Sequence, residues 1–345
     1  MSGSISGLAF GRAAIVVFAA LLTMALSRDP SAAEEAVHTH GPAPDGATLG
    51  AVLPELLALA ESETPKAALV ELRRRMAADD ALAASCHPIV HAIGRAAFAR
   101  FGDFAQSLLY QDEVCNSGYL HGVIEGFFSA AENVDAAMAT ACGETRPQSF
   151  ESWECHHGVG HGIMIYAAND LDRSLELCDS YDDRFAGASC ANGVFMEYFN
   201  PERLPATAAL ADASELFAPC DERKRRHRPD CYLYLPVVYL QRRERDYAGA
   251  LRWCETAKRA YRSTCAKGVG GQAVKENIND PKAIERVCMG ASAPRVKDCI
   301  GGMVGLFMNH HGGLAPARAL CAELEPANRR NCNDIVDARA RLFAS

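Results

Sequence analysis

The chain has 345 residues, of which 49% are hydrophobic and 8% aromatic. This content is enough for one large or two ordinary domains with an apolar core, and it excludes a wholly disordered chain. The formal charge of −8, from 35 basic and 43 acidic residues, argues against a nucleic-acid binder whose affinity depends on neutralising phosphates. Fourteen cysteines indicate either a compartment that tolerates disulfides or a bound metal.

The first 33 residues have the order of a secretory signal, because Arg12 precedes an apolar run at residues 13–26 and small residues follow it. We therefore predict export to the periplasm or the extracellular space, with residues 1–33 cleaved. The alternative is an uncleaved N-terminal segment that anchors the protein in a membrane. We expect no other membrane span. Residues 34–50 are interpreted as a linker, and residues 51–345 as one helical-repeat domain whose repeats begin near residue 81.

A cysteine-led motif recurs along the rest of the chain. Its starts are 29 to 41 residues apart, at Cys86, Cys115, Cys155, Cys190, Cys231, Cys265, Cys299 and Cys332. A second cysteine ends the other half of most units, as in LDRSLELC up to Cys178 and DPKAIERVC up to Cys288. Apolar residues three and four apart, with Asp or Pro at the start of a segment, predict that each unit is a pair of short helices.

Two short helices cannot bury their apolar face alone, so successive units must stack. We therefore predict an all-α fold, an α-solenoid of about seven helical hairpins of roughly 34–40 residues that disulfides cross-link. On their period, small residues and paired cysteines, residues 86–345 resemble Sel1-like and tetratricopeptide repeat proteins of the secreted, disulfide-stapled kind. The resemblance implies this architecture, which is commonly used as a scaffold for interactions.

The spacing of the cysteines predicts how they pair. Six successive pairs are 11 to 13 residues apart, which leaves Cys86 and Cys115 for a seventh bridge. The alternative joins the two helices of one hairpin, for instance Cys155 to Cys178, and leaves Cys86 and Cys332 free. We favour the first register because all fourteen cysteines then pair. A zinc finger and a c-type haem are excluded because the chain contains no CxxC motif.

Histidines concentrate in the first three units. His87 and His91 are four residues apart, as are His157 and His161, so each pair lies on one helical face and can bind one metal ion. His121 and His161 are each the sixth residue after a repeat cysteine, and equivalent helices of stacked units pack about 10 Å apart. We predict a polyhistidine metal site made of His87, His91, His121, His157 and His161, with Glu125 as a further ligand or a catalytic base.

The ligand types narrow the metal and the function. Imidazoles with at most one carboxylate favour copper, zinc, iron or nickel over calcium or magnesium. The pattern argues against a zincin, because Pro88 and Gly158, not glutamate, follow the first histidine of each pair. The site would serve a metal-dependent oxidative or hydrolytic enzyme, or a metal-handling protein. The alternative is a non-catalytic scaffold that binds a protein or peptide in the repeat groove, with histidines that cap helices or line a polar surface.

The remaining histidines receive separate interpretations. We place His156 as the outward neighbour of His157, and His38, His40 and His227 in solvent or in the linker. His310 and His311, near the end of a predicted helix, are interpreted as cations that the helix dipole favours, with a second, weak metal site as the alternative.

Glycines recur three or four apart on the cysteine-led helices, as at Gly118 and Gly122 and at Gly268 and Gly271. An interior helical glycine costs about 1 kcal/mol relative to alanine, so these positions need a reason. They indicate close packing of helices, or a glycine-lined groove with room for a ligand beside the histidines.

Overall fold

The computed structural model describes residues 46–143, 145–200, 215–311 and 313–343. Within these ranges every regular element is a helix and no strand occurs, which confirms the predicted all-α fold. The predicted signal peptide, most of the predicted linker, His38 and His40 lie outside the described residues. The first described helix, α1, begins at Gly46, inside the range predicted as linker.

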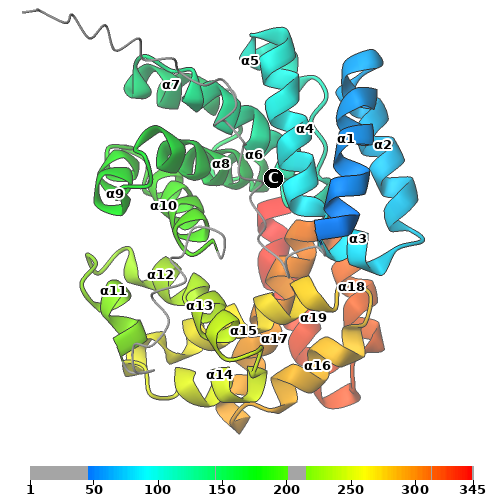
Figure 1. Cartoon of the computed structure of the whole chain (residues 1–345). Coiled ribbons are helices and arrows are strands. Elements are labelled where there is room, and N and C mark those ends of the chain that lie inside the picture. Colours follow the sequence, from blue (N-terminus) through cyan, green and yellow to red (C-terminus); the bar gives the residue numbers. More distant parts are fainter. Residues whose placement is uncertain (1–45, 144, 201–214, 312, 344–345) are drawn as a thin grey trace, which may run out of the picture. The chain divides into compact units, whose positions relative to one another are not determined.

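The helices that contain the repeat cysteines, here called the stacking helices, pack one against the next along the chain. Figure 1 shows them in succession through α4, α6, α8 and α10, and again through α15, α17 and α19. This order confirms a helical-repeat fold. The stacking helices are α4 (Cys86–Phe101), α6 (Val114–Ser129), α8 (Phe150–Tyr166), α10 (Arg184–Tyr198), α12 (Arg228–Tyr234) with α13 (Pro236–Arg242), α15 (Arg262–Glu276), α17 (Ala293–His311) and α19 (Pro326–Phe343).

Shorter connecting helices join the stacking helices, and several begin with a side-chain cap. Asp170, Asp246 and Asp280 each accept a hydrogen bond from the backbone N–H three residues ahead, which satisfies a group that the helix leaves unpaired. The helices outside the stacking set, of which the first three precede α4, are α1 (Gly46–Ser62), α2 (Pro65–Met76), α3 (Asp80–Ala84), α5 (Phe104–Leu108), α7 (Val134–Ala141), α9 (Leu171–Asp179), η1 (Glu215–Phe217), α11 (Ala218–Asp221), α14 (Tyr247–Cys254), η2 (Arg259–Tyr261), α16 (Pro281–Met289) and α18 (Leu314–Glu323).

Seven disulfides use all fourteen cysteines in the favoured register. Six bridges link the end of a connecting segment to the stacking helix that follows, and the seventh joins Cys86 of α4 to Cys115 of α6. No cysteine is free. The alternative bridge from Cys155 to Cys178 is therefore wrong. Disulfides at this density are typical of an oxidising, exported compartment.

Replacing Cys321 and Cys332 together by serine tests the contribution of one bridge. The bridge joins residues 11 apart in sequence, and closing a loop of about this size stabilises a protein by about 3 kcal/mol in the chain-entropy model. We expect the free energy of unfolding to fall by this amount in denaturant titrations. Peptide mapping under non-reducing conditions should still find the other six bridges, and an unchanged stability would contradict the expected role.

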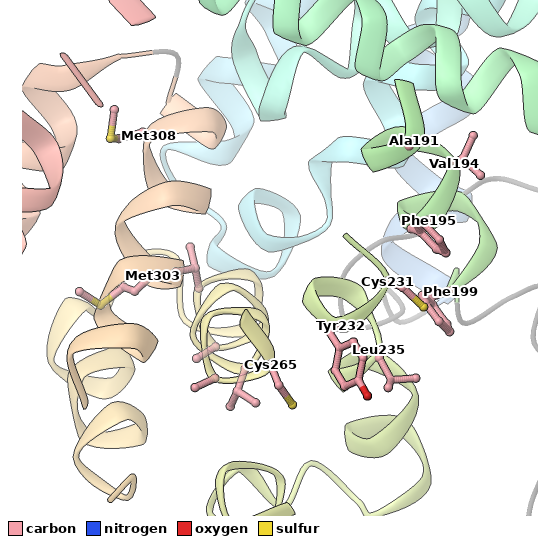
Figure 2. Packing of buried hydrophobic residues seen from close by; sticks show 14 of the residues in the cluster. Ala191, Val194, Phe195, Phe199, Cys231, Tyr232, Leu235, Cys265, Met303 and Met308 are labelled. Carbon is pink, nitrogen blue, oxygen red and sulfur yellow. The ribbon is translucent and has the colours of Figure 1, made fainter. Parts of the chain in front are cut away.

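The buried apolar residues form two clusters, a large one with members from α3 to α19 and a smaller one with members from α1 to α6. One cluster of buried apolar residues includes Phe195 of α10, Tyr232 of α12 and Met303 of α17 (Figure 2). The helix α17 also packs against α6, although more than 160 residues separate them in sequence. A hydrogen bond of 2.6 Å from Asn279 Nδ2 to Asp80 Oδ1 spans a similar separation. Helices of the C-terminal repeats therefore lie close to the helices that carry the candidate histidines.

Two glycines allow the histidine-bearing helices to approach closely. A Cβ atom at Gly122 of α6 would lie 2.0 Å from the carbonyl oxygen of His91 on α4. A Cβ atom at Gly193 of α10 would lie 1.9 Å from the carbonyl oxygen of His157 on α8. Only a residue without a side chain fits at these crossings, which confirms close packing as one role of the repeated glycines.

Among the helices of the described residues, none is long and apolar enough to cross a membrane.

Candidate metal centre

The first histidine pair projects from α4. His87 and His91 are one helical turn apart, and their Nε2 atoms lie 3.0 Å from each other. Each Nδ1 atom faces an oxygen. The backbone oxygen of Cys115 is 2.6 Å from Nδ1 of His87, and Oε1 of Glu125 is 2.9 Å from Nδ1 of His91. His91 is fully buried and His87 is partly buried.

The second pair repeats this arrangement on α8. The Nε2 atoms of His157 and His161 lie 3.2 Å apart. Nδ1 of His157 is 3.0 Å from Oδ1 of Asn192, and Nδ1 of His161 is 3.0 Å from Oε2 of Glu197. Both partners come from α10, the next stacking helix. The i,i+4 spacing thus places each pair on one face, as the sequence predicts.

His121 of α6 lies between the two pairs. Its ring centroid is 5.1 to 5.7 Å from those of the other four histidines. The side chain is fully buried, and neither ring nitrogen has a hydrogen-bond partner among the described residues. Two groups of potential ligand atoms share this ring: one with the α4 pair and one with the α8 pair, each with its ligand atoms within 4.8 Å of one another.

The oxygens around the two pairs fix where the protons are. A backbone carbonyl only accepts hydrogen bonds, so Nδ1 of His87 carries a proton. The carboxylate of Glu125, which also accepts a bond of 2.7 Å from Arg95, places the proton of His91 on Nδ1 in the same way. In a neutral imidazole with a protonated Nδ1, Nε2 holds a lone pair. The contact between the two Nε2 atoms of α4 therefore brings two lone pairs together.

The same reasoning applies on α8. Oδ1 of Asn192 also accepts a bond of 2.7 Å from the hydroxyl of Tyr234, and its Nδ2 donates to Asp230 at 2.7 Å. The amide oxygen therefore faces His157, and the carboxylate of Glu197 faces His161. Both rings therefore carry a proton on Nδ1, and their Nε2 atoms face each other at 3.2 Å.

Two lone pairs in contact need a cation between them. A proton could serve, but burial lowers the pKa of His87, His121 and His157 well below the ordinary value, and neighbouring imidazoles lower it further. Burial also lowers the pKa of His91, against the opposing effect of Glu125. At neutral pH these rings are therefore neutral. The lone pairs are available to a metal ion.

The spacing of the nitrogens fits such an ion. Two nitrogens bound at about 2.0–2.1 Å to one tetrahedral metal lie about 3.3–3.4 Å apart. The contacts of 3.0 and 3.2 Å between Nε2 atoms are close to this value. Each proton on Nδ1 is held by an oxygen acceptor, which is how ligating histidines are usually oriented in metal sites. The residues present thus fit a transition metal.

A strained turn supports one of these acceptors. Cys115, Asn116 and Ser117, at the start of α6, have φ values of 55°, 62° and 51°. Side chains disfavour this left-handed region by roughly 1–2 kcal/mol per residue. The turn contains the carbonyl group of Cys115, whose oxygen faces His87. Backbone strain of this kind persists where the surrounding structure enforces it, often at functional sites.

Three buried glutamates surround the histidines, and the sequence analysis named only Glu125. Glu125, His161 and Glu197 form a third group of potential ligand atoms. Glu154 of α8 places Oε2 3.8 Å from Nε2 of His121. Burial raises the pKa of Glu154 to about 8, so its side chain is largely protonated at neutral pH.

Two cavities reach this centre. One has a volume of about 310 Å³ and includes His157 and Lys275 in its lining. The other, of about 420 Å³, is lined by Glu154 and by polar residues of the loop before α6. Ligand pockets in proteins typically measure about 300–1,000 Å³. The cluster is therefore buried but adjacent to space of ligand size.

The other described histidines belong to none of these groups of potential ligand atoms, and their predicted settings need correction. His156 is buried, with Nδ1 2.7 Å from the backbone oxygen of Ser152, so it is not an outward residue. His227 is also buried, with Nε2 2.8 Å from Oδ1 of Asp179. Burial lowers the pKa of His310 to about 3 and also lowers that of His311, so these residues are not cations at neutral pH.

Sequence reasoning missed the residues that orient the ligands. Arg95 lies four residues after His91, a spacing that could have identified it as a neighbour of the same face. Glu197 follows Met196, which occupies the sixth position after a repeat cysteine where the two preceding units have histidine. Lys275 comes from α15, more than 100 residues beyond the last candidate histidine, and no periodic pattern indicates it.

Comparison of the chain with protein-family models, with curated proteins and with solved structures finds no match.

Proposed function

We propose that this protein is an exported metalloenzyme in which His87, His91, His121, His157 and His161 bind one or two transition metal ions. Copper, zinc and iron are the candidate metals, because the ligands are imidazoles with nearby carboxylates. The observation that carries the proposal is the convergence of two histidine pairs, whose Nε2 atoms lie 3.0 and 3.2 Å apart, on a buried His121 whose ring nitrogens have no hydrogen-bond partner among the described residues. Burial keeps the imidazole of His121 neutral, so its nitrogens can compensate the loss of water by binding a cation.

The cavities favour catalysis over storage. A storage site needs only ligands, whereas a catalytic site needs an open position beside a space for substrate. The cavity of about 310 Å³ supplies this space next to His157. A bound metal ion supplies Lewis acidity toward a water or substrate oxygen, or redox chemistry when it is copper or iron. Oxidative and hydrolytic reactions are therefore the two classes that this centre supports.

The protein's own residues hold the centre in position. Glu125 and Glu197 fix the rings of His91 and His161, and Asn192 fixes His157. Such partners raise the basicity of a ligating imidazole and keep its Nε2 directed at the metal. Glu154, beside His121 and on the wall of the second cavity, is placed to hold a proton near the site. Glu125 is therefore a positioning residue more than a catalytic base.

Elemental analysis of the purified protein tests the proposal. We expect one or two equivalents of copper, zinc or iron per chain. Replacing His121 and His161 together by alanine should remove nearly all of this metal, because His121 belongs to both three-histidine groups. His156→Ala is the matched control, since it removes a buried imidazole from the same stretch of α8 but none from the cluster. Its metal content should equal that of the wild type.

A second variant covers the case in which the double substitution prevents folding. Asn192→Ala removes the acceptor at His157 and leaves every proposed ligand in place. Loss of such a partner typically weakens metal affinity about 10- to 100-fold, which competition with a chromophoric chelator measures. Full metal content in both variants would refute the site. A metal-free wild type would favour the non-catalytic scaffold that binds a protein or peptide in the repeat groove.

The finer assignments of compartment and family belong to this proposal as well. A periplasmic or extracellular location, with residues 1–33 cleaved or retained as an anchor, agrees with the seven disulfides. Kinship with Sel1-like and tetratricopeptide repeats rests on the period and the helical pairs alone. Sequencing the N-terminus of the exported protein tests the cleavage.

A further inference from the structure

The cavity beside His157 contains more positive than negative charge. Lys275 of α15 and Arg339 of α19 line it, and neither forms an ion pair with a residue in the described part of the chain. Burial lowers the pKa of Lys275 to about 8, so the ammonium is mainly protonated at neutral pH. Lys267 adds a third cation, and Asp230 is the one acidic residue in the described lining. Unpaired, partly buried cations favour an anionic ligand.

A buried amide adds an unused polar group. Asn116, in the strained turn of α6, is 7% exposed and lines the same cavity. Its Oδ1 atom has no hydrogen-bond partner among the described residues. An amide can present either its oxygen or its N–H groups to a ligand, depending on its rotation. The strain of this turn is thus compatible with holding a group for binding.

Another part of the cavity wall is apolar. Phe150, Trp153 and Tyr234 bring aromatic rings to the lining. The ring of Trp153 stacks on that of His157, with centroids 5.0 Å apart, and on that of Phe150 at 6.0 Å. Aromatic surfaces of this kind bind the apolar part of a small molecule. The cavity is therefore amphipathic.

Glycines keep the cavity open on the side of α15 and α17. A Cβ atom at Gly271 would meet nothing closer than 3.9 Å, and one at Gly301 nothing closer than 3.7 Å. Helix packing therefore does not require glycine at these two lining positions. A larger side chain there would occupy the space that a ligand needs. The predicted glycine-lined groove beside the histidines thus has a counterpart in this cavity.

From these features we propose that the cavity binds a small organic carboxylate with an apolar, aromatic body, whose carboxylate contacts Lys275 and Arg339. Lys275 lines this cavity together with His157 and a second, small cavity together with His87, so it lies near both halves of the histidine cluster. A carboxylate at Lys275 is therefore held next to the centre. Its role as substrate rests on the proposed function, whereas its binding can be measured with or without metal.

Isothermal titration with phenylacetate tests the binding on both metal-loaded and chelator-treated protein. We expect saturable binding that also changes the fluorescence of Trp153 in a Trp253→Phe background. Phenylacetamide, the neutral analogue, should bind at least about tenfold more weakly, because it lacks the charge that the two cations recognise. Lys275→Met and Arg339→Gln should each lower phenylacetate affinity about 10- to 100-fold.

Two matched variants separate binding in the cavity from binding elsewhere. Gly271→Leu adds a side chain to the cavity wall at a position where a Cβ atom meets nothing closer than 3.9 Å, and it should abolish binding while the metal content stays unchanged. Lys282→Met removes an exposed lysine outside the cavity and should leave binding unchanged. Binding to metal-free protein would support the inference even if the metal proposal failed. The inference would be wrong if metal-loaded protein did not bind phenylacetate, or if it bound phenylacetate equally well after Gly271→Leu.

Discussion

Removal of the metal by dialysis against a chelator is expected to lower the Tm of the protein by about 8–16 °C. A ligand present at about 1,000 times its Kd stabilises the native state by about 4 kcal/mol. In a large domain each kcal/mol shifts Tm by about 2–4 °C. The loss leaves two contacts between Nε2 lone pairs, at 3.0 and 3.2 Å, with no cation between them. Differential scanning calorimetry measures the shift.

The identity of the metal that restores Tm distinguishes a specific site from general effects of metal ions. Adding back one or two equivalents of the native metal should restore Tm, whereas magnesium should not, because imidazole is a poor ligand for it. The variant with His121 and His161 replaced by alanine should show no response to the chelator. If wild-type Tm stayed constant through chelation and reconstitution, the histidine cluster would be a stable metal-free core and the proposed centre would be wrong.

The fold was largely predictable because its signals are local and repeated. The spacing of the cysteines fixed the favoured register, and all seven observed bridges follow it. Asp at the start of connecting segments and apolar residues three and four apart predicted helices that the structure contains. The two helices α1 and α2, before the first repeat cysteine, carry no cysteine, and the repeat pattern does not indicate them.

The candidate site was predictable only where one periodic rule applied. The i,i+4 spacing placed the histidine pairs on α4 and α8, and the shared repeat position placed His121 beside His161, with ring centroids 5.1 Å apart. Whether these residues bind metal stays a prediction. Lys275 of α15 and Arg339 of α19 come from repeats far along the chain and line the same cavity as His157. The helix α17, which packs against both α15 and α19, also contacts α6. No local pattern encodes how far successive units turn, so the cavity could be derived only from coordinates.

Gly122→Ala is expected to damage both the fold and the candidate site. The added Cβ atom would lie 2.0 Å from the carbonyl oxygen of His91 and 2.7 Å from its carbonyl carbon. Backbone atoms of a helix cannot rotate aside, so α4 and α6 must separate. Overpacking of a core costs about 1–3 kcal/mol, and a clash with backbone belongs at the upper end, about 3 kcal/mol. Denaturant unfolding should show this loss, and metal content should fall because His91 moves away from His121.

Gly126→Ala, one turn further along α6, is the matched control. The three atoms nearest to its Cβ would all belong to the side chain of Phe98, at 3.0 to 3.2 Å, and a side chain can shift more easily than a backbone carbonyl. Alanine also has the better helix propensity, by about 1 kcal/mol, which offsets the contact. We expect its stability to stay within about 1 kcal/mol of the wild type and its metal content to be unchanged. Equal stability and equal metal content of the two variants would show that α4 and α6 do not cross closely at Gly122. The proposed convergence of the five imidazoles, which depends on this crossing, would then be wrong.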